Sequence, residues 1–293
     1  MRVGSIESLT DLAQSYVGYA GADKLYYSGL YNAGSEDESG GEDHATKYNM
    51  YARDPWKGIR HAWVFINNVD RVPDMTAEEK LRLKAEAKIT IAVQYSEMLR
   101  HYGALPIVDH AIMPEEMGLP ERATLQQTVD FITRLLDEAI ACKELPWALP
   151  EDDLSNESGR MTGAAAMGLK LRVLLFVASP LFNSHQEGSQ EYKELWYRAA
   201  KANKDVIETC EEAGMRLIDD YENLWDAKSY SSAIDELIFG CRAIRATNSF
   251  EKYNFPVGLE NCRGGNCPTQ TLVDAYELKD GGERPDKKAD YDK

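Results

Sequence analysis

The most apolar stretch of this chain, GRMTGAAAMGLKLRVLLFVASPLFN, runs from Gly159 to Asn183 and carries two charges near its middle, Lys170 and Arg172. A membrane-spanning helix needs about 20 consecutive apolar residues, and a charge at the bilayer centre costs about 2.5–3.5 kcal/mol on insertion scales. The two charges therefore argue against a membrane span. Because Pro180 disfavours helical conformation at the residue before it, we expect a buried helix that ends at Ser179.

Side-chain size changes along this stretch. Thr162 can cap the start of the helix, and the residues that follow it are small. Small residues allow a neighbouring backbone to come close, whereas the larger apolar residues further along can fill a core. The small residues are Gly163, Ala164, Ala165, Ala166 and Gly168, and the large ones are Leu169, Val173, Leu174, Phe176 and Val177.

Helical patterns dominate the rest of the chain. Gly103 and Pro106 suit the end of one helix, and Gly214 suits the end of another. Thr124 and Gln127 can form a capping box. Apolar residues three and four positions apart predict helices over residues 5–20, Trp56–Val69, Ala77–His101, the segment that follows Thr124 and ends before Pro146, and Gln190–Ala213.

These elements predict a mainly all-α protein in which helix pairs stack as tetratricopeptide repeats do. The segment LWYRAAKANKDVI, Leu195–Ile207, has the small residues and aromatics that such helix crossings use. ELIFG, Glu236–Gly240, is the best candidate for a strand. The last 45 residues are irregular in pattern and rich in Gly, Asn, Tyr and Phe.

The chain is acidic: its 293 residues include 33 Lys and Arg and 49 Asp and Glu, which gives a net charge of −16. Such a charge argues against binding to nucleic acid or to anionic lipid, and it is compatible with neutral or cationic ligands. The segment SEDESGGED, Ser35–Asp43, indicates a solvated loop, because it lacks the ordered spacing of a calcium loop. The 16 tyrosines and 5 tryptophans fit either ordinary packing or a stacking surface for sugars or peptides.

Catalytic and metal-binding patterns are absent from the sequence. It has no HExxH, GxSxG, phosphate-binding or dinucleotide-binding motif, and its five histidines are scattered. Five cysteines are too few for a disulfide framework in a chain of this length. Cys262 and Cys267 are open to three interpretations: a loop disulfide, two free thiols, or half of a zinc site. The sequence gives no indication of an enzyme and predicts no cofactor or metal.

Five segments form an ordered set across about 225 residues. They are WKGIRHAWVFINNVD (Trp56–Asp70), EAKITIAVQYSEMLRHYGALPIV (Glu86–Val108), PERATLQQTVDFITRLLDEAIACKELP (Pro120–Pro146), GRMTGAAAMGLKLRVLLFVASPLFN (Gly159–Asn183) and PTQTLVDAYELKDG (Pro268–Gly281). This set resembles the SusD/RagB family, the nutrient-binding outer-membrane lipoproteins of Bacteroidota. The resemblance rests on the order of the segments, because each one alone is unspecific.

The chain departs from the family pattern at several places. Trp63 stands where the family usually has Asn, and Ile91-Ala92 stands where it usually has Arg-Ala. Family members carry a lipoprotein signal, whereas MRVGSIESLT at the start of this chain has no apolar segment. They also continue well beyond the D-G segment. We therefore expect residues 1–293 to be a single SusD-like domain, a fragment that lacks the signal peptide and the C-terminal part.

The resemblance implies a SusD-like fold of tetratricopeptide-like stacked helix pairs with irregular ligand-binding loops. It also implies a non-catalytic function, as the surface-exposed subunit that binds a glycan or another nutrient for a TonB-dependent uptake complex. The expected partners are a SusC-like transporter and a glycan or oligosaccharide. The expected location is the outer face of the outer membrane, reached only through a lipid anchor that this chain does not show.

Two segments have the mix of aromatic, amide and charged residues that suits a sugar. They are HATKYNMYARDPW, His44–Trp56, and NSFEKYNFPVGLENCRGG, Asn248–Gly265. Trp56 is expected to be structural, as are Gly159-Arg160 and Ser179-Pro180. The predicted ligand-binding residues are Tyr48, Asn49, Tyr51, Arg53, Asp54, Tyr253, Asn254 and Arg263.

Two other classes of function remain open from the sequence. One is a tetratricopeptide-type scaffold that binds a protein partner and no small ligand. The other is an α-helical glycoside hydrolase, although no pair of carboxylates stands out among the 49 acidic residues.

Overall fold

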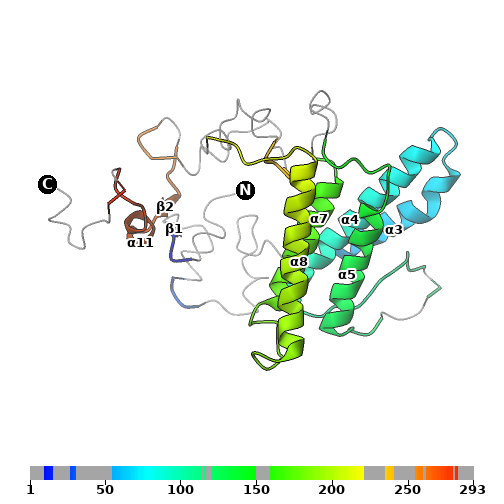
Figure 1. The fold of residues 1–293 in the computed structure, drawn as a ribbon, viewed down its shortest axis with the longest axis horizontal. Helices are drawn as coiled ribbons and strands as arrows, with labels where there is room; N and C mark the ends of the chain where they lie inside the picture. The colour runs from blue at the N-terminus through cyan, green and yellow to red at the C-terminus, as the bar shows by residue number, and fades with distance from the viewer. Residues whose placement is uncertain are drawn as a thin grey trace. The chain divides into compact units, whose positions relative to one another are not determined.

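The structure is a computed structural model that describes residues 10–15, 27–30, 55–113, 115–116, 120–149, 159–220, 235–240, 255–259, 262–279 and 281–282. The chain divides into two compact units. One, here called the helical unit, is Asp54–Arg242, and the other, here called the strand unit, combines Met1–Arg53 with Ala243–Lys293. Figure 1 shows the long helices in the first unit and the two strands in the second.

The described part of the helical unit is built from long helices that pack in chain order. α3 packs on α4, α4 on α5, α5 on α7, and α7 on α8 (Figure 1). This arrangement confirms the mainly all-α fold, and the four helices predicted in this unit outside the apolar stretch all form. Three of them have ends within one residue of the predicted ones, and the helix after Thr124 ends at Ile140, six residues before Pro146. The elements are α3 (Pro55–Asn68), the 3-10 helix η3 (Val69–Arg71), α4 (Ala77–Tyr102), α5 (Leu125–Ile140), α7 (Gly163–Ala178) and α8 (Gln190–Glu212).

Side-chain caps fix where these helices begin. Thr76 and Thr124 each form a complete capping box, with Glu79 at the start of α4 and Gln127 at the start of α5. At the other end of α4, Gly103 has a φ of 71°, a conformation that glycine adopts without steric cost. The predicted capping box at Thr124 and the predicted helix end at Gly103 are thus confirmed.

The apolar stretch forms α7, and its small residues do allow a close approach. The amides of Gly163 and Ala164 donate to the carbonyls of Pro146 and Trp147 at 2.9 and 3.0 Å. A Cβ atom at position 163 would lie 3.1 Å from Cε3 of Trp147, so the glycine makes room for the indole ring. Thr162 caps the helix, which ends at Ala178, one residue before the predicted end. No helix among the described residues has both the length and the apolar character needed to cross a membrane.

Lys170 and Arg172, the two charges of the apolar stretch, point away from the core of the helical unit. Lys170 Nζ lies 2.6 Å from Asp137 Oδ1 on α5, and Arg172 is exposed. The core itself is made by α4, α5 and the two ends of α7. Its fully buried side chains include Ile91, Ala92, Ile132, Leu135, Leu136, Ala139, Ala166 and Ala178.

Arg160 lies three residues before the start of α7 and bonds to the carboxylate of Glu86 on α4. Its guanidinium donates to both oxygens of Glu86, at 2.7 and 3.2 Å, and Arg82 donates to the same carboxylate at 3.0 Å. The Glu86 side chain is only 14% exposed, so the two arginines compensate a largely buried charge. The expectation that Arg160 is structural agrees with this contact.

Tyr95 connects α4 with the loop that follows it. Its hydroxyl donates to the Pro106 carbonyl at 3.0 Å and accepts from the Val108 amide at 2.8 Å. The indole of Trp63 donates to the Val108 carbonyl at 2.9 Å. Trp63, which stands where the family usually has Asn, thus connects α3 with the same loop. Trp56 packs edge-on against Tyr95 at a centroid distance of 5.8 Å, so its predicted structural role is confirmed. Burial raises the pKa of Tyr95 to about 12, so its hydroxyl stays protonated as a donor.

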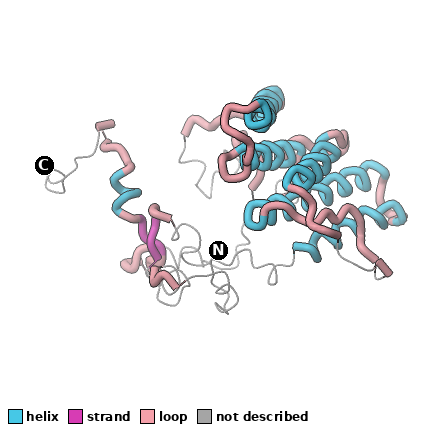
Figure 2. Tube along the Cα trace, turned by 90° about the horizontal axis from the view of Figure 1, so that it is seen from below, coloured by secondary structure: helices cyan, strands magenta, loops and turns pink. Residues whose placement is uncertain are grey.

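The described part of the strand unit contains β1 (Ala13–Ser15), β2 (Asn266–Pro268) and the short helix α11 (Gln270–Asp274). The strands pair antiparallel, with Ala13 opposite Pro268 and Ser15 opposite Asn266. Figure 2 shows the two strands in magenta. The predicted helix over residues 5–20 is therefore wrong at its centre. Pairing with a distant strand outweighs the local helical pattern there, because the pattern takes no account of partners far along the chain.

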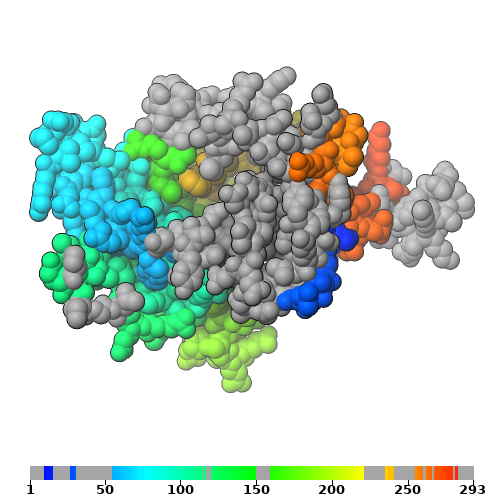
Figure 3. All heavy atoms as spheres, turned by 180° about the vertical axis from the view of Figure 1, so that it is seen from behind, coloured from blue at the N-terminus to red at the C-terminus, as the bar shows by residue number. Residues whose placement is uncertain are grey.

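The predicted strand over Glu236–Gly240 is also wrong, because the segment forms turns and bends. Ile238 instead lies against α7 at Gly168. If Gly168 carried a Cβ atom, that atom would lie 3.4 Å from Cγ2 of Ile238. In Figure 3 the gold atoms of residues 235–240 lie beside the bright green atoms at the start of α7. A short apolar run that packs on a helix satisfies its side chains without a partner strand.

Candidate functional site

Most of the predicted ligand-binding residues lie outside the described part of the chain. This holds for Tyr48, Asn49, Tyr51, Arg53, Asp54, Tyr253 and Asn254, and also for the predicted solvated loop Ser35–Asp43. Their roles stay predictions. The remaining residue, Arg263, is described and exposed, on the loop that leads into β2. The structure therefore supplies local geometry for one part of the second predicted segment.

This part is a closed loop, Phe255–Gly264, whose two ends are joined by a hydrogen bond. The Gly264 amide donates to the Phe255 carbonyl at 2.7 Å, and Gly264 has a φ of 54°, which favours glycine. Inside the loop, the amides of Leu259 and Cys262 donate to the carbonyls of Pro256 and Leu259 at 3.0 Å each. These hydrogen bonds bring Phe255 close to the backbone next to Arg263.

Phe255 and Arg263 give the ends of this loop an aromatic and a cationic group. The Phe255 side chain is 43% exposed, although an aromatic side chain in a folded protein is usually well buried. Arg263 is exposed as well. An aromatic face can stack on the C–H face of a sugar, and a guanidinium can donate to its hydroxyls. The local geometry is thus compatible with a sugar subsite.

Cys262 and Cys267 are both free in the structure, so the loop-disulfide interpretation is not realised. The Cys267 thiol donates to the Gly264 carbonyl at 3.5 Å, which ties it to the end of the closed loop. Within the described ranges, no group of three His, Cys, Asp or Glu residues could hold a metal ion.

A polar cluster lies on the loop after α4. His110 is flanked by Asp109, with 2.8 Å between Nδ1 and Oδ1, and by Glu116, with 2.7 Å between Nε2 and Oε2. The hydrogen bond with Asp109, reinforced by that with Glu116, raises the pKa of His110, and the same bonds lower the pKa of both carboxyl groups. All three side chains are about half exposed or more, so the cluster can order the loop but has no enclosed space for a substrate.

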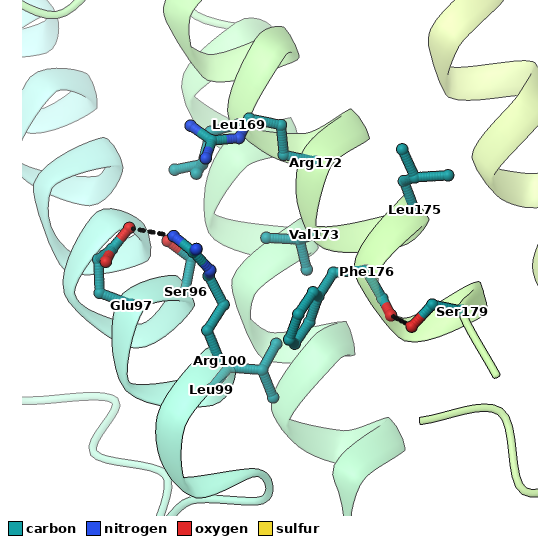
Figure 4. Close-up of a pocket in the computed structure, with 10 residues that line it drawn as sticks. All are labelled: Ser96, Glu97, Leu99, Arg100, Leu169, Arg172, Val173, Leu175, Phe176 and Ser179. Carbon is teal, nitrogen blue, oxygen red and sulfur yellow. Dashed lines mark hydrogen bonds and ion pairs between the residues drawn. The ribbon is translucent and has the colours of Figure 1, made fainter. Parts of the chain in front are cut away.

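The helical unit also has a groove between α4 and α7, which the sequence did not predict. It consists of two adjoining hollows of about 360 and 520 Å³ that share Ser96, Glu97, Leu169 and Arg172. Figure 4 shows the smaller of the two hollows. We call it the α4/α7 groove. A signal was present in the sequence, because Arg172, like Lys170, interrupts an apolar helix, and a charge at such a position marks a face that is not buried.

No protein-family model matches this chain, and no curated protein matches it in sequence. Solved structures do match. A SusD-like protein from Bacteroides fragilis superimposes with a TM-score of 0.70 at 23% identity, over 95% of this chain and 50% of that one. A SusD-like carbohydrate-binding protein from the same species gives 0.69 at 19% identity, over 96% and 48%. A SusD superfamily protein from Parabacteroides distasonis gives 0.53 at 20% identity, over 74% and 40%.

The chain spans about half the length of the two B. fragilis proteins. Their similarity extends over nearly all of this chain, although fewer than a quarter of the aligned residues are identical. Four of the five sequence segments that carried the resemblance form α3, α4, α5 and α7 with their adjoining loops, and the fifth contains α11. The chain therefore has the SusD-like fold, as these five segments predicted.

Proposed function

We propose that this protein is a non-catalytic carbohydrate-binding protein. The observation that carries the proposal is the SusD-like fold, found over 95% of the chain at a TM-score of 0.70. One of the proteins with this fold is described as carbohydrate binding. Two further features of the chain support the proposal: it has no catalytic motif, and its net charge of −16 leaves neutral ligands acceptable.

The proposed binding surface includes the exposed ends of the Phe255–Gly264 loop, with Phe255 stacking on a sugar ring and Arg263 donating to its hydroxyls. Tyr48, Asn49, Tyr51, Arg53, Asp54, Tyr253 and Asn254 complete the proposed set. Aromatic stacking with a few convergent polar groups is the usual way in which proteins hold a small ligand whose faces are apolar and whose rim is polar.

The finer proposal is that the protein serves a TonB-dependent uptake complex at the outer face of the outer membrane. In this proposal a SusC-like transporter receives the glycan, and a lipid anchor outside the given sequence holds the protein at the membrane. The support is the order of the five family-like segments. A test of the partner is co-purification of the full-length protein with a SusC-like transporter from the same organism; a full-length protein that purifies alone at physiological salt would contradict it.

A glycan array followed by calorimetry tests the binding proposal directly. We expect Phe255→Ala and Arg263→Ala to weaken binding of the array's best glycan about 2- to 12-fold, since a stacked aromatic contributes about 0.5–1.5 kcal/mol beyond its buried area. Tyr276→Ala is the matched control, because Tyr276 is a 67% exposed aromatic of the same unit outside the loop.

Two results would contradict the proposal in different ways. If no glycan binds the wild-type protein, carbohydrate binding itself fails and the tetratricopeptide-type scaffold becomes the better description. If glycans bind but both loop variants keep full affinity, the function holds and the chosen loop is wrong. Release of new reducing ends from the bound glycan would instead indicate a glycoside hydrolase.

A further inference from the structure

The α4/α7 groove has an apolar floor and an apolar rim. Its floor includes Ile89, Leu99 and Val173, each at most 4% exposed. Its rim carries Leu175 and Phe239, which are 45% and 47% exposed. α4 and α7 both pack on α5 and contact each other less, and the exposed side chains of Arg172 and Leu175 show that the groove between them reaches solvent. Large apolar side chains gathered along one open groove are typical of an interaction site.

The groove has the length of a short helix. On α4 its lining runs from Ile89 to Arg100, which is 11 residue steps, or about 16 Å at 1.5 Å per residue. The α4 lining residues recur every three or four positions, so they form one stripe along the helix. Because the groove is open along its length, an occupant must be apolar on one side and polar on the side that faces water. An amphipathic α-helix meets this requirement.

The charge of the groove identifies the kind of helix. The charged residues that line it are Glu97, Arg100 and Arg172, which sum to +1 on a chain whose net charge is −16. Arg100 Nη1 lies 3.4 Å from Glu97 Oε1. Arg172 makes no hydrogen bond or ion pair with any other residue in the described ranges, and it lines both hollows (Figure 4). A carboxylate on the occupant is the natural complement of this guanidinium.

We propose that the α4/α7 groove binds an amphipathic α-helix of a protein partner that places a carboxylate against Arg172. The leucine-like side chains of that helix fill the two hollows, and its carboxylate lies between them, where the hollows meet. This interaction is independent of the proposed carbohydrate binding, because none of the residues that line the groove belongs to the proposed carbohydrate-binding set.

The test uses two synthetic peptides of about 14 residues, held helical by a hydrocarbon staple because free helices of this length are marginal in water. Both peptides carry leucines on one face. The first has a glutamate at the middle of that face, and the second has a lysine there. With fluorescence anisotropy on the whole chain, we expect the glutamate peptide to bind about threefold to tenfold more tightly than the lysine peptide. Arg172→Glu should reverse this preference, and Leu175→Ala should weaken both peptides.

Arg60→Glu is the matched control, because it makes the same charge change at an exposed position of α3, outside the groove. If Arg60→Glu reverses the preference as Arg172→Glu does, the effect is one of net charge and the proposal fails. Binding of neither peptide, or equal binding of both, also overturns it. Sedimentation that shows a wild-type dimer and a monomeric Arg172→Glu variant would instead assign the groove to contact between two copies. Carbohydrate binding should be unchanged in Arg172→Glu, which separates this test from that of the proposed function.

Discussion

Each of the two units of this protein is stabilised internally by a different kind of contact. In the helical unit, the helices that pack on each other are neighbours in chain order, and each long helix from α4 onward begins at a side-chain cap. In the strand unit, the Thr269 hydroxyl donates to the carbonyl of Asp11, a residue 258 positions away, and two three-residue strands pair over a similar separation in sequence. Burial of apolar surface therefore stabilises the first unit, whereas hydrogen bonds between distant segments join the described strands of the second.

The largest expected effect comes from breaking the core of the helical unit. Ile132 on α5 is completely buried, so Ile132→Ala should lower the free energy of unfolding by about 2–5 kcal/mol through lost contacts and the cavity that remains. Urea unfolding followed by circular dichroism measures this. The control is Leu81→Ala, since Leu81 is 46% exposed and should cost less than about 0.5 kcal/mol. Equal losses in the two variants would mean that burial does not dominate this unit.

A smaller effect is expected from the ion cluster that joins α7 to α4. Glu86→Gln removes the charge that compensates Arg82 and Arg160, and it should cost about 1–3 kcal/mol because the carboxylate is 14% exposed. The same urea unfolding measures it. Glu208→Gln is the control, because Glu208 pairs with Lys204 on the surface, where such a pair contributes little. A stability unchanged by Glu86→Gln would show that water compensates the arginines equally well.

The same difference between the units explains which structural predictions succeeded. Helix caps such as Thr124, end signals such as Gly103 and the apolar spacing of α5 are all local, so the sequence shows them directly. The pairing of Ala13 with Pro268 depends on two segments at opposite ends of the chain, and nothing near Ala13 indicates it. The helical pattern over residues 5–20 was therefore misleading.

The candidate sites follow the same rule. Arg263 could be proposed from the sequence because an Arg among aromatics in an irregular segment is a local pattern, and the structure adds that Gly264 closes the loop onto Phe255. The α4/α7 groove was missed because it forms between residues of two helices about 80 positions apart in the sequence. Arg172 alone pointed to it, and a single charge on an apolar helix does not say which other helix faces it.

The strand unit can be tested through Thr269. Its hydroxyl caps α11 by accepting from the Leu272 amide and donates to the Asp11 carbonyl, and its amide donates to Leu12. Thr269→Ala should therefore lower the local stability by about 0.5–2 kcal/mol. Amide hydrogen exchange should become faster at residues 12–15 and at Asn266 and Cys267, and stay unchanged in α5.

Two further variants make this result specific. Thr269→Ser keeps the hydroxyl and should retain most of the protection, whereas Thr271→Ala removes a threonine from an exposed position of α11 and should have little effect on the strands. Equal loss of protection in both units after Thr269→Ala would contradict the difference drawn between them.

The smallest expected effect concerns the loop after α4, where charged hydrogen bonds and not apolar burial hold the side chains of His110, Asp109 and Glu116 together. His110 can donate from both ring nitrogens to Asp109 and Glu116 only when it is protonated. Because its pKa is raised above 6.5 in the folded protein, its contribution to stability is complete below that value and is lost as the pH rises through the raised pKa. The loop over residues 109–116 should therefore be best ordered at mildly acidic pH.

An NMR titration of the His110 ring protons measures this effect. In the wild-type protein His110 should titrate above 6.5, and Glu116→Gln should move its pKa back toward that value. Asp109→Asn should produce the larger shift, because the hydrogen bond to Asp109 is the main cause of the raised pKa of His110. The charge of Arg134 also helps to lower the pKa of Asp109. An unchanged His110 pKa in both variants would mean that the two carboxylates do not hold the ring in solution. Since all three side chains are at least 45% exposed, water screens the cluster, and the fold of the helical unit should not change with its titration.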